Sequence, residues 1–214
     1  LESVAEEMAA VCMRTAVSPN IKERRDLSAA VFDGAGRRVA HAAHIPVHLG
    51  AMPLSVRAVL ARHDLGPGDV ALLNDPYEGG THLPDITAVA PVFARDAKRP
   101  SFHVAVRAHH ADVGGSTPGS MAPESDVYAE GTRIPPVLWQ RGGERQADVA
   151  ALLLANMRDP QVRVADLAAH AGALAWGARR LCEMADARTS LRALEMRGGA
   201  LLDYAERIAA NALA

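Results

Sequence analysis

The segment 101–108 constrains the fold most strongly, because its side chains alternate in polarity with the period of two that is typical of a β-strand. One face of this strand is apolar and carries Phe102, Val104, Val106 and Ala108. The other face carries His103, Ala105, Arg107 and His109. By this alternation, His109 points to the polar face of the sheet and His110 to the apolar face.

Apolar periodicity and turn residues predict further elements on both sides of this strand. Helices are predicted at 1–17, at 51–63, from 146 to about 155 and from 160 to about 188. Beyond the last of these, Gly198 and Gly199 are expected to interrupt the C-terminal segment. A β-hairpin is predicted at 29–33 and 37–40, and strands at 70–73 and 86–93. The stretch 114–136 is rich in Gly, Pro, Ser and Thr and is predicted to be a loop. A loop of this length is usually functional or disordered.

This order of elements predicts an α/β fold of mixed α+β character, with helices packed on a mixed β-sheet. The C-terminal region is rich in Ala and is predicted to be helical. We therefore expect a mixed α/β domain at 1–145 and a helical region at 146–214.

Composition and charge exclude several functional classes. The 214 residues include 23 basic and 25 acidic side chains, so that the formal net charge of −2 gives no reason to expect nucleic acid or an anionic membrane as a partner. No apolar run is long enough to span a membrane and no signal peptide opens the chain, so the expected location is the cytoplasm. Cys12 and Cys182 lie far apart and indicate neither a disulfide framework nor a cysteine-based zinc site.

Metal-type ligands are concentrated in two short stretches, 74–85 and 107–112. His82 and Asp85 lie three residues apart in a loop rich in Gly and Pro, and His109 ends the predicted strand. Imidazole and carboxylate together suit Mn, Zn or Fe better than Ca or Mg. Three protein ligands leave coordination positions open for water or substrate, which is typical of a catalytic centre. Asp112 or Asp75 could orient a ligand imidazole.

Simpler interpretations remain open. His82, Asp85 and His109 could form a hydrogen-bonded polar cluster without a metal. The pair His44 and His48 would need a helix to bring both rings to one face, and Pro46 argues against that helix. Five histidines are expected to have structural or surface roles: His41, His44, His48, His63 and His170. The stretch 114–119 lacks the Lys-Ser/Thr ending of a P-loop, so no nucleotide site is expected in this chain.

Several blocks, in order along the chain, resemble the hydantoinase B/oxoprolinase family. They are 18–26 (SPNIKERRD), 44–50 (HIPVHLG), 74–85 (NDPYEGGTHLPD), 107–115 (RAHHADVGG), 128–136 (YAEGTRIPP) and 156–160 (NMRDP). That family includes the B subunit of ATP-dependent N-methylhydantoinase, the C-terminal part of 5-oxoprolinase and the α subunits of acetone carboxylase-type enzymes. Its members are generally longer, so the resemblance implies an N-terminal portion whose helical region continues into a longer domain.

The resemblance implies an enzyme that depends on a partner. In the family, an A-type subunit of the actin-like ATPase kind binds ATP and phosphorylates the carbonyl oxygen of the substrate, and the B-type subunit completes the reaction. Carboxylase relatives hold Mn with a His-x-x-Asp pair and a downstream His. His82 and Asp85 match the pair, and His109 matches the downstream residue, with His110 as the alternative.

The resemblance thus implies an oligomeric cyclic-amide hydrolase with a small-molecule substrate, inactive without its partner. The expected ligands are His82, Asp85 and His109, with Asp112 and Asp75 orienting them. Arg107 or Arg133 would meet a carboxylate or phosphate. Two alternatives stay open: a metal-dependent subunit of an acetone carboxylase-type enzyme, and a non-catalytic assembly domain.

Overall fold

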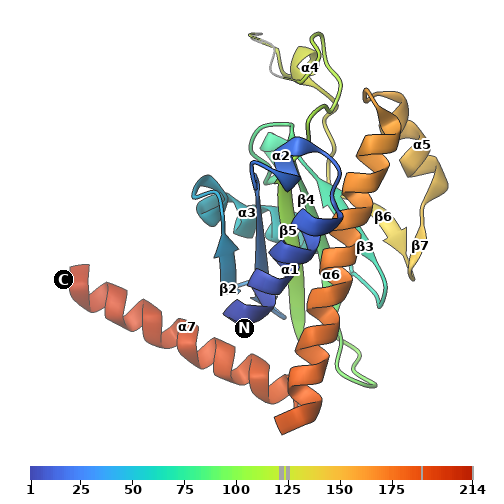
Figure 1. Ribbon diagram of the computed structural model, residues 1–214. Coiled ribbons are helices and arrows are strands. Elements are labelled where there is room, and N and C mark those ends of the chain that lie inside the picture. Colours follow the sequence, from blue (N-terminus) through green and yellow to red (C-terminus); the bar gives the residue numbers. More distant parts are fainter. Residues whose placement is uncertain (121–122, 124–125, 189, 214) are drawn as a thin grey trace.

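The computed structural model describes residues 1–120, 123, 126–188 and 190–213, and its centre is one twisted β-sheet (Figure 1). Within these residues the sheet has seven strands in the order β2-β1-β5-β4-β3-β6-β7. The strands are β1 (Leu27–Asp33), β2 (Arg38–Ala43), β3 (Val70–Leu73), β4 (Asp85–Val92), β5 (Phe102–His109), β6 (Val137–Arg141) and β7 (Glu144–Arg145). The strand predicted from alternation is therefore confirmed as β5, and it lies in the middle of the sheet.

The predicted α/β class is confirmed, but the strand pairing differs from the expected mixture. Each pairing in the described part of the chain is antiparallel. The physical reason lies in the connections. β1 and β2, β4 and β5, and β6 and β7 are each joined by short links, which reverse the chain direction, whereas a parallel pair needs a crossover of a dozen or more residues.

Helices cover both faces of the sheet. Their bounds are α1 (Glu2–Thr15), α2 (Pro19–Lys22), α3 (Val47–Arg62), η1 (Pro76–Glu78), α4 (Val127–Glu130), α5 (Ala147–Ala155), α6 (Pro160–Arg188) and α7 (Leu191–Leu213). α1 and α6 pack together on one face, and α3 lies on the other (Figure 1). Since both faces are covered, the central strands are buried on both sides.

The core consists of two apolar layers, one on each face of the sheet. The layer under α1 and α6 contains the predicted apolar face of β5, with Phe102, Val104, Val106 and Ala108. The layer under α3 contains Ala105 together with Phe32, Met52 and Val56. Leu167, Leu174 and Leu181 of α6 belong to the first layer, so this helix completes the core of the sheet. Each fully buried leucine contributes roughly 1.5–3 kcal/mol to stability.

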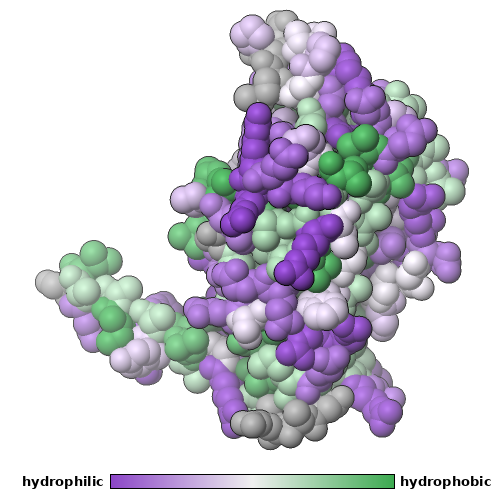
Figure 2. Space-filling model, viewed as in Figure 1, coloured by the Kyte–Doolittle hydropathy of each residue, from purple (hydrophilic) through white to green (hydrophobic). Residues whose placement is uncertain are grey.

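The C-terminal helix differs from expectation because α7 continues through Gly198 and Gly199. A Cβ atom at Gly198 would meet Cγ1 of Val39 at 3.3 Å, so the glycine allows α7 to pass close to β2. Beyond this contact α7 extends away from the sheet, and apolar side chains are visible on its surface (Figures 1 and 2). Leu201 and Ile208 are more than half exposed there. In the described part of the chain, no helix is long and apolar enough to cross a lipid bilayer.

Candidate metal centre

The predicted ligands meet at one end of the sheet because of the antiparallel pairing of β4 and β5. Asp85 begins β4 and His109 ends β5, and the two residues are direct cross-strand partners. His82 lies in the connection just before β4, where the amide of Asp85 donates to the carbonyl oxygen of His82 at 3.1 Å. Two pieces that are distant in sequence are therefore placed together by strand register.

The connection between η1 and β4 depends on glycine. Gly79 adopts a positive φ of 91°, which favours a residue without a side chain. At Gly80 a Cβ atom would lie 2.1 Å from the carbonyl oxygen of Asn74, closer than any real contact. These two residues allow the chain to fold back on β3 and carry His82 to Asp85.

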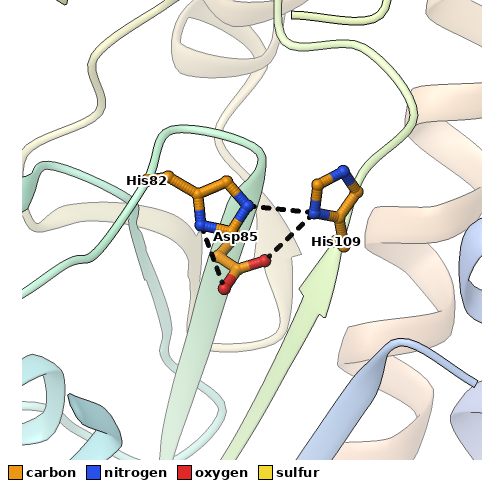
Figure 3. Close-up of side chains that lie close together, drawn as sticks. All are labelled: His82, Asp85 and His109. Carbon is orange, nitrogen blue, oxygen red and sulfur yellow. Dashed lines mark hydrogen bonds and ion pairs between the residues drawn. The ribbon is translucent and has the colours of Figure 1, made fainter. Parts of the chain in front are cut away.

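Figure 3 shows that the three side chains point toward one another. Nε2 of His82 lies 3.1 Å from Nδ1 of His109. The carboxylate of Asp85 lies below both rings, with Oδ2 at 3.5 Å from Nδ1 of His82 and Oδ1 at 3.4 Å from Nδ1 of His109. One ligand atom from each residue falls within 4.8 Å of the others, so the set is compact enough to hold one metal ion.

Asp85 is the buried centre of this cluster, with an exposed fraction of only 1%. Burial alone raises the pKa of a carboxyl group, but the imidazoles of His109 and His48 outweigh it and hold the pKa of Asp85 well below its usual range. Its Oδ1 atom is buried and makes no hydrogen bond to any residue that the structure describes. An ionised, buried oxygen without a hydrogen-bond donor is well suited to a cation.

The two imidazoles complete the fit. Burial lowers the pKa of His82, and the opposing attraction of Asp85 does not cancel this, so the ring is neutral near pH 7 and can donate an electron pair. The side chain of His82 is 45% exposed whereas that of Asp85 is 1% exposed, so the site opens on the His82 side. The donor set of two imidazoles and a carboxylate fits Mn, Zn or Fe.

Two further residues of the site, His48 and Asp26, were missed by the sequence reasoning. Nε2 of His48 lies 3.0 Å from Oδ2 of Asp85, and its Nδ1 lies 3.0 Å from Oγ of Ser28. Asp26, His48 and Asp85 form a second compact group of ligand atoms. Pro46 stands at the N-cap of α3, so His48 enters the first turn of this helix while His44 stays outside it, as expected for that pair. The signal was present, since both residues lie in blocks that resemble the family.

His110 lies outside this cluster. It is fully buried and packs edge-to-face against His170, with ring centroids 5.1 Å apart. Neither ring has a hydrogen-bond partner among the described residues. The structure therefore brings His109, and not His110, to His82 and Asp85.

Asp112 lies in a separate network that fixes the following loop. Its carboxylate accepts from the amides of Gly114 at 2.8 Å and Gly119 at 2.9 Å, and it pairs with Arg158 at 3.1 Å. Burial raises the pKa of Asp112, but the amides of Gly119, Gly114 and Arg158 outweigh it and lower the pKa overall. Within the described part of the chain, the hydrogen bonds and the ion pair of this carboxylate thus go to the loop and to Arg158.

Arg107 lies beneath the cluster, two residues before His109 on the same face of β5. It is fully buried and donates from Nε to Oγ1 of Thr87 at 2.8 Å and from Nη2 to Oγ of Ser55 at 2.6 Å. Burial lowers the pKa of Arg107, and the nearby charge of Asp85 opposes this. Arg107 therefore supports the charge of Asp85 from the interior.

Asp75 lies in the turn after β3 and not among the ligands. Its Oδ1 accepts from the amide of Tyr77 at 3.0 Å, and its Oδ2 pairs with Nε of Arg133 at 3.2 Å. These contacts place Asp75 with Arg133, at the same end of the sheet as the ligands.

Comparison with known proteins identifies the family. The model of the Hydantoinase B/oxoprolinase family matches residues 1–214, and the chain belongs to this family. It is 50% identical over 134 residues to a 5-oxoprolinase of Saccharomyces cerevisiae. The matched stretch covers 61% of this chain and 10% of that protein. It is 35% identical over 190 residues to caprolactamase subunit beta of Pseudomonas jessenii, covering 87% of this chain and 32% of the relative.

A solved structure shows the same fold. The crystal structure of the ATP-dependent caprolactamase from Pseudomonas jessenii superimposes with a TM-score of 0.86 at 32% sequence identity, covering 97% of this chain and 36% of the other. The chain therefore spans about a third or less of the length of these relatives.

Proposed function

We propose that the chain is the B-type part of an ATP-dependent cyclic-amide hydrolase of the hydantoinase/5-oxoprolinase kind. The observation that carries this proposal is the convergence of His82 and His109 on the buried carboxylate of Asp85, whose Oδ1 makes no hydrogen bond to any described residue. Family membership supports this reaction class. Two relatives are named for 5-oxoproline and caprolactam, and both of these molecules contain a cyclic amide.

His82, Asp85 and His109 would hold a divalent ion, Mn, Zn or Fe. Such an ion supplies Lewis-acid polarisation of a carbonyl or phosphoryl oxygen. His48 would fix the carboxylate that faces it: with Nε2–H donating to Asp85, Nδ1 accepts a hydrogen bond from the hydroxyl group of Ser28. The exposed side of His82 leaves room for a small-molecule substrate to approach.

ATP would be bound by a separate A-type subunit of the actin-like ATPase kind. In this chain the glycine-rich loop offers poor support for a phosphate, because the amides of Gly114 and Gly119 already donate to Asp112. One relative is a beta subunit, and its solved structure is that of an ATP-dependent enzyme. The B-type part would receive the activated substrate in an oligomeric complex and would be inactive alone.

Elemental analysis of the purified and reconstituted chain tests the metal site. We expect about one equivalent of Mn, Zn or Fe per chain, lost in both His82→Ala and His109→Ala. His110→Leu is the matched control, since it alters the neighbouring histidine and should keep the metal. Retention of metal in both alanine variants would refute the ligand set. The reaction class is tested separately by ATP-dependent ring opening of 5-oxoproline or a hydantoin after assembly with an A-type subunit.

A further inference from the structure

An exposed arginine lies close to two tyrosines at the same end of the sheet as the ligands. Cζ of Arg133 lies 5.8 Å from the ring centroid of Tyr77 and 5.5 Å from that of Tyr128, within cation–π distance of both. The tyrosines themselves are 73% and 72% exposed. Asp75 pairs with Nε of the arginine at 3.2 Å. We call these four residues, Asp75, Tyr77, Tyr128 and Arg133, the arginine clamp.

The backbone on both sides of Arg133 is tied to the ligand loop by one buried residue, Asn74. Its Nδ2 donates to the carbonyl oxygens of Thr132 at 2.9 Å and Leu83 at 2.7 Å, and its Oδ1 accepts from the amide of Ile134 at 2.6 Å. Leu83 lies between the ligands His82 and Asp85. The position of Arg133 is therefore fixed relative to the metal centre.

The guanidinium has unused binding capacity. Its Nε pairs with Asp75, and neither Nη1 nor Nη2 makes a hydrogen bond with the residues that the structure describes. These two nitrogens form a planar fork that matches a carboxylate or phosphate. The two neighbouring rings and Asp75 restrict the side chain in advance, which lowers the entropy cost of binding.

We propose that the arginine clamp recognises an anionic oxygen pair, either the carboxylate of the substrate or the phosphoryl group of its activated form, beside the metal centre. The identity of the ligand rests on the proposed function, whereas anion binding itself does not. The clamp would favour cyclic amides that carry a carboxylate over unsubstituted lactams.

The chain contains three tyrosines, which makes the test selective. Tyr77 and Tyr128 belong to the clamp, and Tyr204 on α7 is an internal reference. With 3-fluorotyrosine incorporated, 19F NMR titrations would use 5-oxoproline, 2-pyrrolidinone (the same ring without the carboxylate) and inorganic phosphate. We expect saturable shifts at Tyr77 and Tyr128, but not at Tyr204, with at least one of the two anions and none with 2-pyrrolidinone. Saturation by 5-oxoproline alone assigns the carboxylate, and saturation by phosphate alone assigns the phosphoryl group.

Arg133→Gln should weaken this binding at least about tenfold, and Arg133→Lys should restore only part of it because the fork is lost. Arg62→Gln is the matched control, because Arg62 is an exposed arginine that pairs with Glu78 next to Tyr77. Equal binding of 2-pyrrolidinone, unchanged binding in Arg133→Gln, or no saturable shift with either anion would overturn the proposal. If Arg133→Gln instead abolished association with an A-type subunit and left anion binding intact, the clamp would be a docking surface.

The titrations are run on metal-free protein and on His82→Ala. Anion binding should persist in both. Absence of a metal site would therefore leave the anion-induced shifts intact, whereas a wrong assignment of the clamp would remove them.

Discussion

His109 and His110 are neighbours in sequence but belong to two different regions of the molecule. His109 lies in the cluster around Asp85, where the rings meet a carboxylate and remain accessible from one side. His110 lies on the opposite face, beneath α6, where its ring is fully buried beside His170. The difference arises from the pleat of β5, which sends successive side chains to opposite faces.

The comparison shows that burial and histidine content do not by themselves identify a ligand. Burial, together with repulsion from His170 and Arg163, lowers the pKa of His110 well below its usual value, and burial lowers that of His170 to about 4. Only the Asp85 region, among the described residues, combines imidazoles with a carboxylate close enough to share an ion. Substitutions in the two regions should therefore differ in their effects on metal affinity and on the free energy of unfolding, in both size and sign.

Asp85→Asn should have the largest effect. It removes the buried charge but keeps the shape of the side chain, so we expect the affinity for the divalent metal to fall by about a thousandfold, since loss of one partner of a buried ionic contact costs about 3–5 kcal/mol. Isothermal titration calorimetry with Mn and Zn measures the change. An affinity equal to that of the wild type would show that the metal, if bound, does not depend on Asp85.

His170 should make the buried region sensitive to acid. Its pKa is about 4 in the folded chain against 6.5 for an ordinary histidine. Between these two pKa values the unfolded chain binds one more proton than the folded chain. The contribution of neutral His170 to the free energy of unfolding is therefore present above pH 6.5 and is lost as the pH falls toward 4. The loss amounts to about 3 kcal/mol. Urea unfolding from pH 7 to 4 should show a shallower decline for His170→Leu than for the wild type. Parallel declines would contradict the prediction.

His48→Gln should have an intermediate effect on the metal centre. The amide retains one hydrogen bond toward Asp85 but cannot bridge to Ser28 in the same way, so the carboxylate is held less firmly. We expect the metal affinity to fall by about 10–100-fold without abolishing binding. His44→Gln provides the matched control, because His44 lies in the same segment and outside both compact ligand groups. Equal affinities of the two variants would remove His48 from the site.

Local patterns predicted much of the fold around β5. The strand at 70–73 was predicted with the observed bounds, and the strands at 86–93 and 101–108 differ from β4 and β5 by one residue. The same alternation assigned His109 and His110 to opposite faces, and resemblance to the family singled out His82, Asp85 and His109. These features depend on short stretches of sequence, where spacing and side-chain type are sufficient.

The features that sequence did not predict depend on contacts between distant segments. The bond from His48 to Asp85 joins residues 37 positions apart, and it depends on a helix that begins just after Pro46, four residues before the predicted start. β6 and β7 were not predicted, and β6 is held by pairing with β3 on the far side of the sheet centre. α7 passes through two glycines because Gly198 faces Val39. In each case tertiary packing decided the outcome over local propensity.

His110→Leu should have the smallest effect and the opposite sign to the ligand variants. Both ring nitrogens of His110 are buried without a hydrogen-bond partner among the described residues. An apolar side chain of similar size therefore removes the free-energy cost of burying these polar atoms. We expect the free energy of unfolding to rise by about 1 kcal/mol, with the metal content unchanged. Urea unfolding at pH 7.5, where histidine titration contributes little, measures the first quantity, and elemental analysis measures the second. A loss of stability would show that the ring nitrogens are satisfied by ordered water, and a loss of metal would show that the two faces of β5 are coupled.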